Sequence, residues 1–300
     1  MSKLDNGTEY YEYLLLYVDD CLVISENPDQ VLSRLEKYFS LKPESVGPLK
    51  LYLGGKLSKV DLPNDVKAWA IGASKYIQNA LKNLESILKK HGLYLRKGNN
   101  SPLPCNYMPE CDMMPECDKD DARLHASLIG ILRWLDELDQ IDICCEVSMM
   151  SSHTVLPRER HLNHVIYMFS YLKCHHNSRV VLDPTYPDID MDKFPQYNWK
   201  RLYGNVKEII PENAPKPIGK EFIIRAFVDT DFAGDSLTWR SSTGFLVMLN
   251  GAPIYWLSKK QSSMETSSFG SEFVVMRQCC EYLKGLRYKL RMMGIPVTTR

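Results

Sequence analysis

The sequence contains no apolar run long enough to cross a bilayer, because its hydrophobic stretches fall far short of the ~20 residues that a spanning helix needs. Its start, MSKLDNGTEYYEY, is polar and acidic, unlike the hydrophobic core of a secretory signal. We therefore expect an intracellular protein, cytoplasmic or nuclear, with no membrane partner.

The chain also lacks an excess of charge and a regular cysteine framework. Lys plus Arg and Asp plus Glu each number 37, so any nucleic-acid surface must come from local basic patches. Nine cysteines is an odd count. The adjacent pairs Cys144/Cys145 and Cys279/Cys280 fall inside helical patterns, which favours reduced thiols over disulfides.

Three further cysteines, Cys105, Cys111 and Cys117, are spaced six apart in CNYMPECDMMPECD. Zinc sites usually use pairs about two to four residues apart plus a further ligand. We therefore interpret the repeated MPECD as a short duplication in a loop and favour that over a metal clip.

The composition is that of a globular chain, with 300 residues of which 44% are hydrophobic, enough for two domains with cores. Its first part reads as an α+β block, with a hairpin, a helix from Asn27, strand-like stretches LKLYLGG and KAWAIGA, and a helix from Ser74. After a loop at 95–120, three helical patterns predict a compact bundle. These are DARLHASLIGILRWLDEL, IDICCEVSMMSSH and PRERHLNHVIYMFSYLKCHH.

The last part of the chain carries a second pattern. Residues 183–219 contain six prolines among polar residues, which predicts a connection between domains. Beyond it, 222–228, 244–249 and 253–258 read as strands, and 269–293 reads as a long helix.

Two acidic clusters stand beside apolar runs that are typical of buried strands. In YEYLLLYVDDCLVISE, Asp19 and Asp20 lie between LLLYV and CLVI. Adjacent carboxylates repel each other unless a cation neutralises them, so the pair marks either a hairpin turn or part of a Mg²⁺ site. In FVDTDFAGD, Asp229 ends a predicted strand, and Asp231 follows two residues later. Glu272, early in the long helix, either complements the helix dipole or faces back to that strand end.

The FVDTDFAG stretch also has the strand-then-DxD form of haloacid-dehalogenase-like phosphatases, in which the first Asp is a nucleophile. Ala233 and Gly234 stand where that family carries a Thr, which counts against this alternative.

An ordered set of motifs resembles the Pol polyprotein of copia-type retrotransposons. YVDD resembles the active-site hairpin of reverse transcriptases, and the family's order continues through nearly the whole chain, most weakly at 95–120 and 183–219. The further motifs are YLGGKL, SKYIQNAL, SLIGILRWL, QIDICCEVSMMSSH, HVIYMFSYLK, FVDTDFAGD, WRSSTGFLVML, PIYWLSKKQ and SSFGSEF.

The resemblance implies a multidomain fold of α+β and α/β parts. A partial reverse-transcriptase palm with helical thumb and connection elements would occupy 1–182, a linker 183–219, and a truncated RNase H-like α/β domain 220–300. The activities implied are those of an RNA-directed DNA polymerase and of a ribonuclease that cleaves RNA–DNA hybrids.

The resemblance also implies site residues. Asp19 and Asp20 match the paired aspartates of the polymerase motif, with Tyr17 near the primer end. Asp229 matches the first metal-binding aspartate of the ribonuclease H domain, and Glu272 matches its helix-borne glutamate. The implied cofactor is Mg²⁺, two ions in each site. The implied partners are an RNA template, DNA, an RNA–DNA hybrid and the remainder of a Pol polyprotein.

Other residues near these motifs receive smaller roles. Asp231 lies where this subgroup often carries an acid, and we give it no ligand role. A set of basic side chains could contact the phosphates of a hybrid, although a solvated charged face is an equally good interpretation. The set is Arg240, Lys259, Lys260, Arg277 and Lys284.

Both carboxylate sets are incomplete relative to the family pattern. The family brings a further aspartate from well upstream of the hairpin, whereas sixteen residues precede Tyr17, and it takes later aspartates from segments after the long helix, where this sequence reaches GIPVTTR. Mg²⁺ demands near-octahedral ligation, so two carboxylates in a site bind it weakly. We therefore expect little or no polymerase activity and poor hybrid cleavage from this chain alone. The alternative is a non-catalytic nucleic-acid-binding protein or a decayed transposon remnant.

Overall fold

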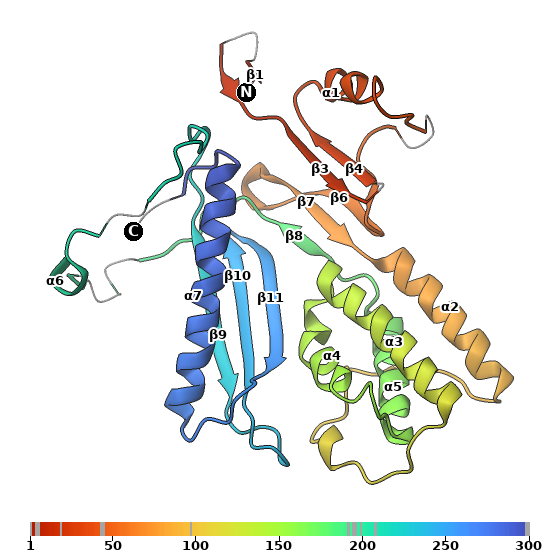
Figure 1. Ribbon diagram of the computed structural model, residues 1–300. Helices are drawn as coiled ribbons and strands as arrows, with labels where there is room; N and C mark the ends of the chain where they lie inside the picture. Colours follow the sequence, from red (N-terminus) through yellow and green to blue (C-terminus); the bar gives the residue numbers. More distant parts are fainter. Residues whose placement is uncertain are drawn as a thin grey trace.

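The computed structural model describes residues 2–297, except 4–6, 19, 43–45, 97, 191–192, 194–196, 199 and 207–208. Figure 1 shows an N-terminal hairpin region, a block of helices, and a small sheet that lies between this block and one long helix. No helix within these described ranges combines the length and the apolar character that crossing a membrane requires.

The N-terminal region is built from short antiparallel pairs. Strand β1 (Ser2–Lys3) pairs with β2 (Glu9–Tyr10), and β3 (Tyr13–Tyr17) pairs with β4 (Asp20–Ile24) as the predicted hairpin. Helix α1 (Pro28–Leu35) follows. Its first turn is stabilised because the side chain of Asn27 accepts a hydrogen bond from the backbone N–H of Gln30.

A four-stranded antiparallel sheet comes next, in the order β5-β6-β7-β8. Its strands are β5 (Leu51–Tyr52), β6 (Gly55–Asp61), β7 (Lys67–Gly72) and β8 (Val180–Leu182). The sequence predicts β5 and β7. It does not predict β6, whose GKLSKVD alternates with few apolar residues, or β8, which is three residues long and pairs with a strand far earlier in the chain.

The helical block confirms the predicted bundle. It contains α2 (Ser74–Lys90), α3 (Lys119–Leu138), α4 (Cys144–Ser151) and α5 (Glu159–His175). Its apolar faces meet in one core, which gives the block its own stability. The largest fully buried apolar side chains there are Ile77, Leu84, Leu132, Leu135, Ile143, Met150, Met168, Phe169 and Leu172.

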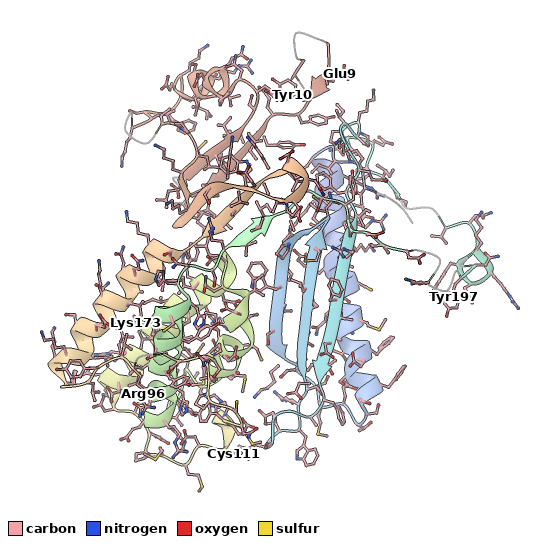
Figure 2. All side chains as sticks on the ribbon, turned by 180° about the vertical axis from the view of Figure 1, so that it is seen from behind. Glu9, Tyr10, Arg96, Cys111, Lys173 and Tyr197 are labelled. Carbon is pink, nitrogen blue, oxygen red and sulfur yellow. The ribbon has the colours of Figure 1, made fainter. Side chains whose placement is uncertain are left out.

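The predicted loop before α3 is confirmed as irregular, apart from a short 3-10 turn at Pro109–Cys111. Figure 2 shows Cys111 at the end of the helical block. Cys105, Cys111 and Cys117 are all free thiols, and no group of three metal-binding side chains exists among the described residues.

The final part is a three-stranded antiparallel sheet of order β11-β10-β9, followed by one helix. The elements are β9 (Ile224–Asp231), β10 (Ser242–Leu249), β11 (Ala252–Lys260) and α7 (Ser268–Met292), close to the predicted ranges. Helix α7 covers one face of this sheet, and its apolar core contains Phe245, Val247, Val275 and Cys279.

The opposite face of the terminal sheet rests on the helical block. Strand β11 packs against α4 and lies beside β8. The indole N–H of Trp256 in β11 donates to the backbone and side-chain oxygens of Asp136 in α3, at 3.1 and 3.0 Å. The terminal sheet is therefore enclosed between α7 and the helices (Figure 1).

The N-terminal hairpin is fastened to the far end of α7. The hydroxyl of Tyr13 donates to the carbonyl of Met293 at 2.7 Å, and that of Tyr11 donates to the carbonyl of Lys216 at 2.8 Å. The connection between the block and the terminal sheet carries one short helix, α6 (Lys200–Tyr203).

Candidate functional site

The first acidic cluster lies at the tip of the β3–β4 hairpin. Tyr17 pairs with Asp20 across the turn, and Val18 adopts a left-handed backbone conformation with φ of 53°. Asp20 is exposed at the first position of β4. Asp19, the other member of the predicted pair, lies outside the described residues.

The apolar runs of this hairpin are not buried, which corrects the sequence-based expectation. Leu16 is 68% exposed and Val18 is 93% exposed, and Leu14 and Leu15 are also exposed. The reason is that β3 and β4 form a sheet of two strands by themselves, so no second layer covers both of its faces. The site residues Tyr17 and Asp20 therefore project from an open apolar hairpin.

The second acidic cluster lies where β9 ends beside the start of α7. The hydroxyls of Thr230 and Ser271 are 3.0 Å apart and form a hydrogen bond between strand and helix. The side chain of Gln261, which follows β11, donates to the hydroxyl of Thr243 and to the carbonyl of Ser271, each at 3.2 Å. This buried polar group fixes the first turn of α7 against all three strands.

Glu272 follows Ser271 and lies on the side of α7 that faces the sheet. Glu272, Val275 and Cys279 have the spacing i, i+3 and i+7, which places them on one face of a helix. Val275 and Cys279 belong to the core beneath the sheet. The half-buried carboxylate therefore points toward the end of β9, as the second of the two sequence interpretations expects.

Asp229 and Asp231 lie on the other face of β9. Successive residues of a strand point to opposite faces, and Thr230 points to α7. The carboxylate of Asp229 accepts a hydrogen bond from the backbone N–H of Thr230 at 2.9 Å. The structure thus brings the elements of Asp229 and Glu272 together, but the two side chains stand on different faces of the sheet.

Asp231 faces the helical block. It lines a small cleft of about 90 Å³ between the sheet and α4, together with Cys145, His153, Ser242 and Lys260. Its carboxylate also lies over Gly234, where a Cβ would be 1.9 Å from a carboxylate oxygen, so this glycine makes room for the acid.

The sequence analysis missed Asp235, which is the best-bound acid of this region. Its carboxylate is buried and pairs with the ammonium of Lys260. Burial raises its pKa, but the hydrogen bonds from Lys260 and Thr238 outweigh that effect and hold the pKa at about 2. The only sequence signal is its place as the last residue of FVDTDFAGD.

The predicted basic residues do not share one surface. Lys259 and Lys260 are neighbours on the edge strand β11 and therefore point to opposite faces, with Lys260 turned to Asp235. Arg240 is exposed in the turn before β10, and its carbonyl accepts the N–H of Asp235. Arg277 and Lys284 lie two turns apart on α7, where Arg277 pairs with Glu281 at 3.8 Å.

Comparisons with known proteins add distant relationships over most of the chain. No family model matches, and no solved structure matches. The chain is 26% identical over 264 residues to an uncharacterized mitochondrial protein of Arabidopsis thaliana, covering 87% of this chain and 88% of the relative.

Two transposon proteins are similar over a larger share of the chain. The retrovirus-related Pol polyprotein from transposon TNT 1-94 of Nicotiana tabacum is 22% identical over 94% of this chain, and that from transposon RE1 of Arabidopsis thaliana is 23% identical over 95%. The chain spans 18% and 16% of the lengths of these two polyproteins. It is therefore distantly related to a region of retrotransposon Pol polyproteins.

Proposed function

We propose that this chain represents the part of a copia-type Pol polyprotein that joins a reverse-transcriptase palm, thumb and connection to an RNase H-like domain. One observation carries the proposal. Asp229 ends β9, Glu272 lies on the sheet-facing side of α7, and the Thr230–Ser271 hydrogen bond holds these two elements together. A strand-borne aspartate next to a helix-borne glutamate is the pair that the resemblance expects of a ribonuclease H domain.

The chemistry expected of that family uses two Mg²⁺ ions, which activate the attacking oxygen and stabilise the leaving one. The residues of this chain do not fit such a centre in the present arrangement. Among the described residues no three metal-binding side chains converge, and Asp229 stands on the face opposite α7. We therefore propose that this chain alone cleaves RNA–DNA hybrids weakly or not at all, and that it does not polymerise DNA.

A second candidate function is nucleic-acid binding without catalysis, with an RNA template, DNA or a hybrid as partner. It is favoured by the exposed cations Arg240 and Lys259, which lie on the terminal sheet and the turn that follows β9. Phosphate contacts of this kind position a duplex and carry no sequence information. Such binding weakens steeply as salt rises, because each contact releases condensed counterions.

Cleavage of a labelled RNA–DNA hybrid in Mg²⁺ and in Mn²⁺ tests the catalytic proposal. The chain is compared with an Asp229→Asn, Glu272→Gln double variant, which removes both charges and keeps the side-chain shapes. We expect no cleavage above background from either protein. Cleavage that disappears in the double variant would show that the site assembles in solution, contrary to the proposal of incomplete ligation.

Binding of the same hybrid, measured by fluorescence anisotropy at increasing salt, tests the second function. An Arg240→Ala, Lys259→Ala variant should bind more weakly and with a shallower salt slope. The matched control is Lys82→Ala, Lys89→Ala, which removes two exposed cations from α2 instead. Equal loss in both variants would point to non-specific attraction and against a surface on the terminal sheet.

A further inference from the structure

Strand β9 is the outermost strand of the terminal sheet, and its free edge carries unpaired backbone groups. Ile223 points its backbone toward β10, because its N–H and carbonyl both bond Asn250. Phe222, one residue earlier, points the other way and donates its N–H to the carbonyl of Pro296 at 3.3 Å. Backbone directions alternate along a strand. The N–H and carbonyl groups that face the open edge are therefore those of Ile224, Ala226 and Val228.

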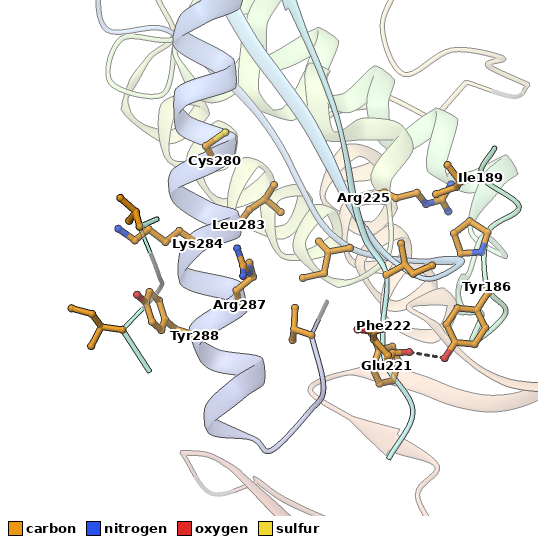
Figure 3. Close-up of a pocket in the computed structure, with 16 residues that line it drawn as sticks. Tyr186, Ile189, Glu221, Phe222, Arg225, Cys280, Leu283, Lys284, Arg287 and Tyr288 are labelled. Atoms are coloured by element: carbon orange, nitrogen blue, oxygen red, sulfur yellow. Dashed lines mark hydrogen bonds between the residues drawn. The ribbon is translucent and has the colours of Figure 1, made fainter. Parts of the chain in front are cut away.

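A long groove runs beside this edge. It has a volume of about 1180 Å³ and lies between β9 and the outer side of α7. Figure 3 shows Cys280, Leu283 and Arg287 of α7 on one side of it and Phe222 on the other. Nearer the start of α7, Phe273 is 61% exposed and Met276 is 53% exposed, and Val228 of β9 is 37% exposed. An apolar helix stripe thus accompanies the open strand edge along its length.

The polypeptide that follows α7 already enters this groove at one end. Val297 forms a parallel bridge with Phe222, two residues before β9 begins. The preceding turn is held by a hydrogen bond of 2.9 Å from the N–H of Ile218 to the carbonyl of Gly294. A chain that continues in this direction runs parallel to β9 and meets its unpaired groups in sequence.

We propose that the free edge of β9 takes up a parallel, extended strand that runs on from Val297. Only a polypeptide repeats donors and acceptors at the spacing of ~3.3 Å per residue that the edge presents. Its apolar side would cover the stripe of Phe273 and Met276 on α7. The basic residues that line the groove favour carboxylates in that strand. They are Arg225, Lys284 and Arg287, against a single acid, Glu221.

The strand proposal does not depend on any catalytic role, so it can be tested on the chain itself. The 300-residue chain is extended past Arg300 by an alternating valine–glutamate octapeptide, and a matched chain is extended by a glycine–serine octapeptide. Amide hydrogen exchange then reports on the edge groups of Ala226 and Val228. We expect at least ~10-fold slower exchange with the valine–glutamate extension than with the glycine–serine one. Equal exchange in the two chains would overturn the proposal.

A point variant separates edge pairing from general stabilisation. Val228→Pro removes an N–H that points to the open edge and leaves the bonds between β9 and β10 intact, a position at which proline is tolerated. In the valine–glutamate chain this variant should abolish the slow exchange at Ala226, whereas Val228→Thr, which keeps the N–H, should retain it. Slow exchange that survives the proline would show that the extension acts elsewhere.

The same valine–glutamate octapeptide added as a free peptide tests whether the strand must be continuous with Val297. A tether raises the effective concentration to the millimolar range. We therefore expect no slowing of exchange by the free peptide at ~0.1 mM. Full protection by the free peptide at that concentration, without protection in the extended chain, would replace the proposal with a separate strand partner.

Discussion

The hydroxyl of Thr230 in β9 lies 3.0 Å from the hydroxyl of Ser271 in α7. Ser271 is fully buried, and its hydroxyl also donates to the carbonyl of Ser268 at 2.8 Å. Since Thr230 follows Asp229 and Ser271 precedes Glu272, this one contact sets the separation of the two acids that the sequence singles out. The position of the acids thus rests on uncharged neighbours.

Replacing Thr230 by Val should destabilise the protein by about 1–2 kcal/mol, because it leaves the buried hydroxyl of Ser271 with one partner fewer at almost unchanged volume. Urea unfolding followed by circular dichroism measures this change in the free energy of unfolding. The control is Thr266→Val, at an exposed position just before α7, which should stay within ~0.5 kcal/mol of the parent.

The double variant Thr230→Val, Ser271→Ala shows whether the two hydroxyls act as a pair. Its loss should be smaller than the sum of the two single losses by about 0.5–1.5 kcal/mol, the coupling expected of residues in contact. Strictly additive losses would mean that the two hydroxyls do not interact in solution.

The sequence predicts most helices and strands because they follow local patterns. Asn27 caps α1, the apolar alternation after Phe222 gives β9, and the long helix keeps its period from Ser268 to Met292. Strands β6 and β8 escape this kind of reasoning. Their pairing partners, and not their own residues, make them strands, since β8 acquires its ladder from β7.

The candidate site is predictable only in part. Spacing places Asp229 at a strand end and Glu272 in a first helical turn, and both positions are confirmed. Which face each acid occupies depends on how Thr230 meets Ser271, and that contact joins residues far apart in the chain. Burial of the hairpin is wrong for a similar reason, because LLLYV can be covered only by another layer of structure.

Gly294 and Gly285 should respond to the same substitution with opposite signs. Gly294 has φ of +71°, and a Cβ there would lie 2.2 Å from the ring of Tyr11, so Gly294→Ala should cost at least about 1–2 kcal/mol. Gly285 lies inside α7 with open space around it, so Gly285→Ala should stabilise by about 0.5–1 kcal/mol. Thermal and urea unfolding of both variants measure the difference.

Removal of the ring that covers Gly294 separates the two causes of its loss. In a Tyr11→Ala background the clash is absent, so Gly294→Ala should cost only what the left-handed backbone imposes. An unchanged cost in that background would show that the hairpin does not dock on the end of α7 in solution.

The hydrogen bonds between Trp256 and Asp136 should hold the terminal sheet on the helical block. Trp256→Phe keeps an aromatic ring but removes the N–H, which leaves the half-buried Asp136 short of a donor. Burial raises the pKa of Asp136, and the bond from Trp256 lowers it, so the carboxylate should become easier to protonate in the variant. We expect a loss of about 1–3 kcal/mol at pH 7 by urea unfolding.

The control for this contact is Trp239→Phe, an exposed tryptophan in the turn before β10. It changes the same chemical group without touching the helical block. If both variants lose equal stability, the Trp256–Asp136 contact contributes nothing of its own.

The buried His125 should make the protein less stable in mild acid. It lies in the core of the helical block, and neither ring nitrogen has a hydrogen-bond partner among the described residues. Burial, followed by the nearby His161 and His153, lowers its pKa to about 4, whereas an unfolded histidine titrates near 6.5. The unfolded state therefore binds the extra proton as the pH falls from about 6.5 to 4. Stability should drop across that window by up to ~1.4 kcal/mol per pH unit.

The measurement compares the free energy of unfolding of the parent and of His125→Leu at several pH values between about 7 and 4.5. Asp139 has the opposite effect, because burial raises its pKa to about 6 and its protonation favours the folded state as the pH falls. That contribution is present in both proteins and cancels in their difference. The advantage of the leucine variant over the parent should therefore grow steadily as the pH falls through the window, and a constant difference would mean that His125 does not titrate as a buried, neutral ring.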